Sequence, residues 1–377
     1  MSLASGAAGA SGMPDTGARR LAPDRALAVW LFLCAGCVLA VLMVGGITRL
    51  THSGLSIVQW QPLTGVLPPL SDSDWNALFA QYQATPEFRL MNAAMTLEEF
   101  RPLFWWEYAH RLLGRAAGAV FLLPFVHFVL TGRVTRTLAW RLAGIFVLGG
   151  LQGALGWYMV ASGLVDDPHV SALRLAAHLG MALMLIGLLL WTGWSVLRPQ
   201  AGCRAPPPIA LAALAAVFLM ALSGALVAGT RAGLAYNTFP LMDGHLVPPD
   251  LLRPGAWTTD FLDNLAAVQF LHRALALGVI TLVLALALRL APMRALRSQA
   301  PGAAAGRALP RLLLVALALQ VTLGIATLLS GVALPLAAAH QAGAVLLLAG
   351  VLRAVFVSGL AGPAQRPVTP ESGVTGH

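Results

Sequence analysis

The sequence predicts an all-α integral membrane protein with eight transmembrane helices, arranged as two tandem four-helix bundles. Three observations support this prediction: the composition, eight long apolar segments and an internal repeat. Hydrophobic residues make up 58% of the 377 residues and charged residues only 10%, whereas a soluble domain carries about 25% charged residues. The composition therefore excludes a soluble globular protein.

Eight segments have the length of about 20 apolar residues that a helix needs to cross the bilayer core. The predicted spans are residues 27–47, 107–130, 138–160, 173–196, 209–229, 264–288, 311–330 and 335–357. Arginines concentrate in alternate connections, at 131–137, 197–208 and 289–310. Arginine bias of this kind marks the cytoplasmic side. Topology thus accounts for the net charge of +9, both termini are predicted to be cytoplasmic, and no nucleic-acid partner is predicted.

The predicted organisation has five parts. They are a flexible cytoplasmic tail over residues 1–26, a first bundle over 27–197, a cytoplasmic linker over 198–208, a second bundle over 209–357 and a cytoplasmic tail over 358–377. The first bundle contains a long, aromatic-rich outer connection over residues 48–106, where a stretch such as 74–83 is predicted to be a short helix. Aromatic residues favour the membrane interface. The connection is compatible with a lid over an outer-leaflet site and with an interfacial anchor.

An internal repeat relates the two halves. The matching stretches are 44–49 with 227–231, 110–111 with 272–273, 151–156 with 319–324, and 176–180 with 338–342. His178 follows His110 at the same spacing as His340 follows His272. Four helices return the chain to the starting side of the membrane, so the repeats are predicted to be parallel.

The four repeated histidines are the candidate metal ligands. The predicted topology places His110, His178, His272 and His340 at a similar depth in the outer leaflet, one pair per bundle. Two imidazoles that face each other in a bundle core suit the axial positions of a haem iron. Helix–helix hydrogen bonding, a proton relay or a transition-metal site are the alternatives. No third ligand recurs in both halves, which favours haem over another metal site.

Arginines near the histidine pairs are candidates to bind haem propionates, since guanidinium groups bind carboxylates in a bidentate manner. The candidates are Arg49, Arg111, Arg115 and Arg174 in the first half, with Arg231 and Arg273 in the second. Snorkelling to the membrane interface is an alternative explanation for Arg49, Arg174 and Arg231.

The two halves differ at one chemically important position. Glu107 lies three residues before His110, whereas Gln269 lies three residues before His272. A desolvated carboxylate can perform acid–base or charge-stabilising work, which a neutral amide cannot. The first half is therefore predicted to be the chemical site and the second a permanent haem site. The preference of glutamate for the first turn of a helix is the competing explanation.

At these residues the sequence resembles the haem A synthase family. The resemblance rests on the Glu107-x-x-His110-Arg111 motif, on His178, His272-Arg273 and His340, and on the run Gly-Gly-Ile-Thr-Arg-Leu-Thr-x-Ser-Gly-Leu-Ser that begins at Gly45. It implies oxidation of the C8 methyl of haem O to a formyl group through a hydroxymethyl intermediate, by an oxidoreductase of the bacterial inner membrane.

The resemblance also implies the role of each site residue. Glu107 is the essential carboxylate, His110 and His178 flank the iron of the substrate haem, and His272 and His340 ligate a haem b. One branch of the family carries a cysteine pair in the first outer loop. Residues 48–106 contain no cysteine, so the chain resembles the branch that mitochondrial and many proteobacterial members share.

Besides haem O and membrane lipid, the implied partners are haem O synthase by pathway and an unidentified electron-transfer protein; a homo-oligomer is possible.

Two other functions stay open. A dihaem b-type electron-transfer cytochrome would leave both haems unmodified, but it predicts symmetric sites. A haem or small-molecule transporter is the second alternative, although the broken helices common in transporters are not evident.

Overall fold

The computed structural model describes residues 23–62, 64–165, 167–198, 205–253, 257–291 and 303–360. Eight helices in these residues are long and apolar enough to cross a membrane, as predicted. They are α1 (Arg25–Leu50), α4 (Leu97–Leu130), α5 (Arg136–Ala161), α6 (Ala172–Leu197), α7 (Pro208–Thr230), α9 (Leu265–Leu290), α11 (Ala303–Leu329) and α12 (Leu334–Ser358). Nearly all of both predicted tails, and most of the predicted linker, lie outside the described residues.

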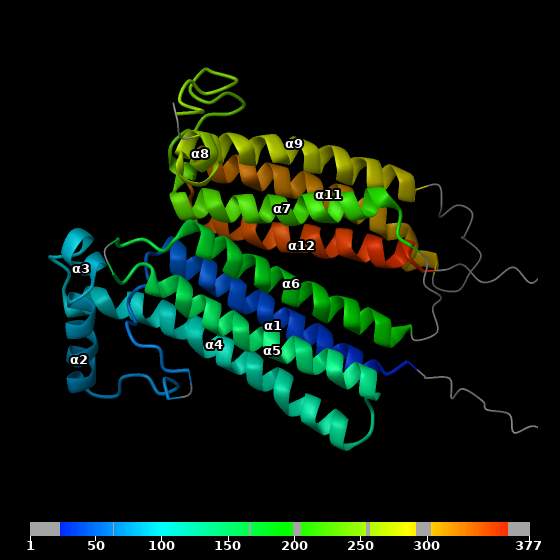
Figure 1. Cartoon of the computed structure of the whole chain (residues 1–377), viewed down its shortest axis with the longest axis horizontal. Coiled ribbons are helices and arrows are strands. Elements are labelled where there is room, and N and C mark those ends of the chain that lie inside the picture. The colour runs from blue at the N-terminus through cyan, green and yellow to red at the C-terminus, as the bar shows by residue number, and fades with distance from the viewer. Residues whose placement is uncertain are drawn as a thin grey trace, which may run out of the picture.

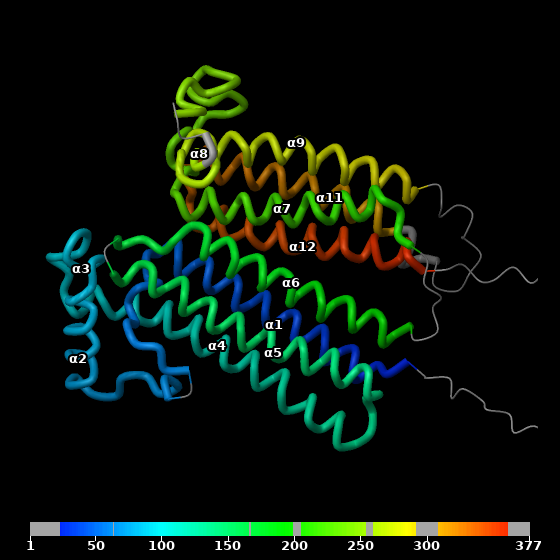
Figure 2. Tube along the Cα trace, in the orientation of Figure 1, coloured from blue at the N-terminus to red at the C-terminus, as the bar shows by residue number. Residues whose placement is uncertain are grey.

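The eight long helices form two adjacent groups (Figure 1). One group contains α1, α4, α5 and α6, and the other contains α7, α9, α11 and α12. The groups meet where α6 packs against α7 and where α12 packs against α1 and α6. Figure 2 shows the first residues of α1 and the last residues of α12 at the same end of the helices. An even number of membrane spans returns the chain to the side on which the first span began.

Polar side chains fix where several helices begin. The side chains of Thr96, Thr135, Ser171 and Asn264 accept hydrogen bonds from backbone N–H groups in the first turns of α4, α5, α6 and α9. Such caps satisfy donors that have no partner inside the helix. Helices α7 and α12 instead carry a proline in the first turn, where its missing N–H costs nothing.

Helix α4 is longer than the predicted span, which starts at residue 107. It begins at Leu97, after a capping box formed by Thr96 and Glu99. The added turns bury Phe100 and Phe104 in an aromatic cluster. Hydropathy alone does not identify this part of the helix, because its sequence is too polar for a membrane span and its apolar side chains pack against the outer connection.

The outer connection forms a packed layer over one end of the first group. It contains α2 (Asp72–Gln83) and α3 (Pro86–Met91), which lie beside the start of α4 in Figure 1. Helix α2 confirms the predicted helix at 74–83. The rings of Tyr82 and Phe100 stack with centroids 5.1 Å apart, and Trp75 meets Phe104 edge to face at 5.0 Å. This layer therefore has an apolar core of its own.

The second group has a smaller outer segment. It contains the 3₁₀ turn η1 (Ala232–Leu234) and the short helix α8 (Trp257–Asp263). The largest apolar core lies mainly within the second group and includes Val217 of α7 and Val351 of α12; it reaches the first group at Leu42 of α1. Close packing of this kind keeps neighbouring helices in fixed register.

Candidate functional site

Glu107 is buried at the junction between α4 and the outer layer. Its side chain is only 2% exposed. One carboxylate oxygen, Oε2, accepts hydrogen bonds from the Ser56 hydroxyl at 2.7 Å and the Ile57 N–H at 2.8 Å. The other, Oε1, accepts from Nε and Nη2 of Arg111 at 3.1 and 2.6 Å. Four donor contacts therefore fix the carboxyl group of Glu107 in one orientation.

Two arginines on α4 fasten the outer connection to the helix. Arg111 also donates to the carbonyls of Ile57 and Gln59, both at 2.7 Å. Arg115 donates to the carbonyls of Gln61 at 2.6 Å and Pro62 at 3.0 Å. Each of these two guanidinium groups thus donates to two loop carbonyls, and the structure does not test their predicted role in binding propionates.

The second half contains a matching arrangement with a neutral amide. Gln269, also 2% exposed, donates through Nε2 to the Ala232 carbonyl at 2.8 Å and accepts from Arg273 at 3.1 Å. Arg273 donates in addition to the carbonyls of Tyr236 and Thr238, both at 3.0 Å. Arg273 therefore anchors the second outer segment as Arg111 anchors the first.

The two positions are not interchangeable, because the partner groups have opposite polarity. Oε2 of Glu107 faces a backbone donor, the Ile57 N–H. The corresponding amide nitrogen of Gln269 faces a backbone acceptor, the Ala232 carbonyl. Each outer segment thus presents the group that its own side chain requires, and the difference between the halves extends beyond one residue.

The first histidine of each pair makes a hydrogen bond through Nδ1. His110 Nδ1 lies 3.0 Å from the Val41 carbonyl of α1, which can only accept, so this nitrogen carries the proton. In a neutral ring Nε2 is then unprotonated, the form in which imidazole binds a metal. His272 Nδ1 lies 2.8 Å from the Ser223 hydroxyl of α7, which can either donate or accept.

The second histidine of each pair lies against the backbone of a neighbouring helix. His178 interacts with the backbone of Gln152 and His340 with that of Gln320, although neither Nδ1 has the geometry of a regular hydrogen bond. His178 is near enough to His110, and His340 to His272, for the charge of one ring to act on the other. The structure therefore brings each predicted pair together.

Glycines on neighbouring helices make room for the four imidazoles. A Cβ at Gly45 would lie 2.5 Å from His110 Cε1, and a Cβ at Gly156 would lie 2.8 Å from His178 Cε1. In the second half a Cβ at Gly324 would lie 2.8 Å from His340 Cε1, and a Cβ at Gly224 would lie 3.3 Å from His272 Cε1. The close approach of helix backbone and ring is thus a shared property of all four positions.

Arg49 and Arg231 differ from the arginines on α4 and α9. Arg49 lies in the last turn of α1, and Arg231 caps α7 in a left-handed conformation with φ 62°. Neither guanidinium has a hydrogen bond or an ion pair with a residue that the structure describes. Their charges act on each other and, together with burial, which has the larger effect, lower the pKa of nearby His52. These two arginines have donors available for an anionic group.

Comparison with known proteins identifies the family. Residues 28–352 match the COX15-CtaA family, described as cytochrome oxidase assembly protein. The chain belongs to this family.

Individual members of the COX15-CtaA family are similar over nearly their whole length. A protein of Nitrosospira multiformis is 49% identical over 91% of this chain and 96% of its own. A protein of Rhodospirillum centenum is 48% identical over 93% of this chain and 92% of its own. A third, from Nitrosomonas eutropha, is 45% identical over 86% and 92%. All three are named Heme A synthase.

In this member of the COX15-CtaA family, sequence reasoning found the charged residues of the site but missed their partners. Ser56 ends the motif that begins at Gly45, yet nothing in the motif reveals that its hydroxyl reaches Glu107. The Val41 carbonyl carries no residue-type signal at all. Ser223 could have been noticed, because it is a polar residue in an apolar span and occupies the repeat position of Val41.

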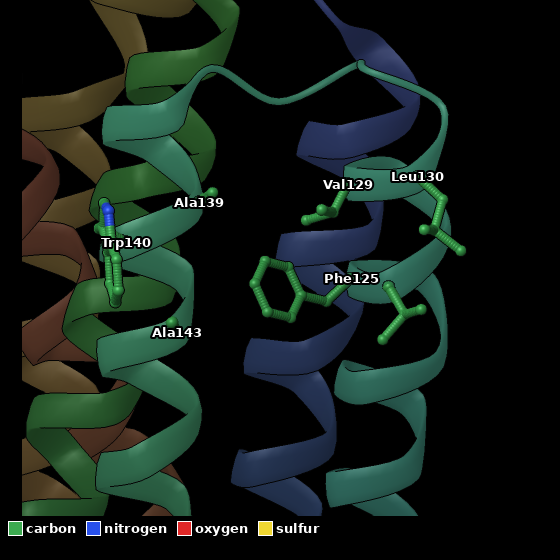
Figure 3. Close-up of a pocket in the computed structure, with 7 residues that line it drawn as sticks. Phe125, Val129, Leu130, Ala139, Trp140 and Ala143 are labelled. Carbon is green, nitrogen blue, oxygen red and sulfur yellow. The ribbon is translucent and has the colours of Figure 1, made fainter.

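An apolar hollow of about 290 Å³ lies elsewhere, between α4 and α5. Figure 3 shows Phe125 and Val129 of α4 directed toward α5, which carries Ala139 and Ala143. At about 1.5 Å of rise per residue, Phe125 lies roughly 22 Å along α4 from His110. This hollow is separate from the histidine site.

Proposed function

We propose that this membrane protein is an oxidoreductase of haem A synthesis. It oxidises the C8 methyl of haem O to a formyl group through a hydroxymethyl intermediate, and its second bundle holds a haem b. The single observation that carries the proposal is the difference between Glu107 and Gln269 in otherwise matching surroundings. The names of the relatives support the same pathway.

One haem is assigned to each bundle, between its two histidines. His110 and His178 flank the iron of the substrate, and His272 and His340 ligate haem b, which would supply one-electron redox chemistry when bound. The hydrogen bonds that His110 and His272 make through Nδ1, and the glycines beside all four rings, support this assignment. Haem, rather than another transition metal, is favoured because each site offers two imidazoles with no third ligand repeated in both halves.

Arginines bind the propionates in this proposal. Arg49 and Arg231 are the stronger candidates, because their guanidinium groups have no other partner among the described residues. Arg111, Arg115 and Arg273 hold the outer segments in place and contribute their remaining N–H groups. A guanidinium group near a carboxylate provides charge and two parallel hydrogen bonds.

Glu107 stabilises the positive charge that develops as the methyl group loses electrons and protons. A fixed charge in a site of low dielectric constant acts strongly and needs no reorganisation. Glu107 lies one turn before His110, on the same face of α4. Proton acceptance is the alternative role, but an added proton would displace one of the four donor contacts of the carboxylate, so the geometry favours charge stabilisation.

The protein is proposed to lie in the bacterial inner membrane with the haem sites toward the outer leaflet. The clusters around Glu107 and Gln269 lie toward the ends of α4 and α9 that join residues 48–106 and 230–263, the connections predicted to face the outside. Haem O synthase would supply the substrate, and a separate electron-transfer protein would accept the electrons. The family description as cytochrome oxidase assembly protein is consistent with a product destined for that oxidase.

A dihaem electron-transfer cytochrome remains the second candidate, because the two halves have matching histidine pairs. Haem extraction after co-expression with a haem O synthase separates the two functions. Haem A or hydroxymethyl haem in the extract supports the oxidoreductase. An extract with haem B and unaltered haem O alone supports the cytochrome.

A further inference from the structure

A hydrogen bond crosses between the bundles next to a proposed haem ligand. Gln341 directly follows His340 on α12, and its Nε2 donates to the Leu42 carbonyl of α1 at 2.9 Å. The amide of Gln341 also occupies the space beside Gly46, where a Cβ would collide with it. Gln341 therefore belongs to the second bundle by sequence but contacts the backbone of the first.

The same stretch of α1 positions a histidine of the first bundle. The carbonyl of Val41, the residue before Leu42, receives the Nδ1 proton of His110 at 3.0 Å. Gly45, the residue before Gly46, allows the His110 ring to approach the helix. Residues 41–46 thus contact His110 on one side and Gln341 on the other, through adjacent residues of a single helix.

The contact is not reciprocal. Leu179 follows His178 as Gln341 follows His340, and leucine has no side-chain hydrogen-bonding group. Leu179 packs instead against the large apolar core of the second bundle. Among the described residues, a hydrogen bond of this kind therefore runs from the second bundle to the first, without a counterpart from the position after His178.

We propose that Gln341 is a positioning residue for the first histidine site. By holding the Leu42 carbonyl, it sets the position of the Val41 carbonyl and with it the orientation and tautomer of His110. The proposal rests on the proposed function insofar as His110 flanks an iron. A helix backbone transmits the constraint because residues 41–46 lie within little more than one turn.

The test uses full-length protein purified with the haem that it carries, and compares low-spin haem spectra by electron paramagnetic resonance. His110→Ala and His272→Ala identify the signal of each site. Gln341→Met keeps the shape of the side chain but removes the hydrogen bond, and Gly46→Ala displaces the amide from the other helix. Gly36→Ala is the matched control on α1, because a Cβ there meets nothing within 4 Å.

The expected result is that Gln341→Met and Gly46→Ala both shift the signal of the His110 site. The affinity of the His110 site for haem should fall about fivefold, which is the typical effect of losing one buried hydrogen bond. The signal of the His272 site and the spectrum of Gly36→Ala should stay as in the unmodified protein.

Three results would overturn the proposal: no change in either signal, a change confined to the His272 site, or equal loss at both sites with a lowered melting temperature. The last two indicate a local effect at His340 and simple bundle packing, respectively. If instead the unmodified protein lacks a signal that depends on His110, the proposed function fails independently of Gln341.

Discussion

Replacing Glu107 with glutamine should abolish most haem A formation while leaving the second haem site intact. The change removes the charge and turns an amide N–H₂ toward the Ile57 N–H, which then has no acceptor. An unsatisfied buried donor costs about 1–3 kcal/mol, and the charge-assisted contact with Arg111 is weakened as well. Loss of one charge-stabilising group at a reaction centre typically lowers the rate by about 10²–10³-fold.

The ratio of haem A to haem O in extracted membranes measures this effect, and the absorbance of haem b reports on the second site. Ser56→Ala is the matched control. It removes one of the four donor contacts of Glu107 but keeps the carboxylate, so it should reduce product only about fivefold, by roughly 1 kcal/mol. Near-normal haem A in Glu107→Gln would refute the charge-stabilising role. An equal loss in both variants would indicate that orientation matters rather than charge.

The remaining predictions concern stability and haem retention. Burial, and to a smaller extent the charge of nearby Glu107, raise the pKa of Glu87 from 4.5 to about 7. Between pH 4.5 and about 7 the folded protein therefore binds more protons than the unfolded chain. Its free energy of unfolding falls by up to about 3 kcal/mol as the pH rises through this range. Glu87→Gln should flatten the dependence of melting temperature on pH, and parallel profiles would contradict this. Gly324→Ala should release haem from the second site, since the new methyl would lie 2.8 Å from His340 Cε1. Gly278→Ala, in open space on α9, should retain it; equal haem content in both would disprove the packing argument. Thr96→Ala should destabilise the start of α4 by about 1 kcal/mol, visible as faster amide exchange there, and unchanged exchange would rule out the cap.

The spans were predictable because each one is a run of apolar residues long enough to cross the bilayer. The start of α4 was not, because Phe100 and Phe104 pack against the outer connection in a stretch that also carries charged residues. Short helix α2 was recoverable, since it has local capping and helix-forming residues.

At the site, the repeat predicted which histidines pair, because spacing along the chain is preserved between the halves. It did not predict that Arg111 and Arg115 donate to loop carbonyls, since a backbone carbonyl has no residue-specific signature. The partners of Glu107 and His110 were likewise hidden. Those contacts join residues far apart in sequence, and only the packing of α1 and the outer connection on α4 brings them together.

Chromatography of extracted haems tests the central claim most directly. The chain and a haem O synthase would be expressed together in a host that makes neither haem O nor haem A, and the extract compared with that of the synthase alone. The account predicts haem A or hydroxymethyl haem only when this chain is present. Haem B and unaltered haem O in both extracts would contradict it.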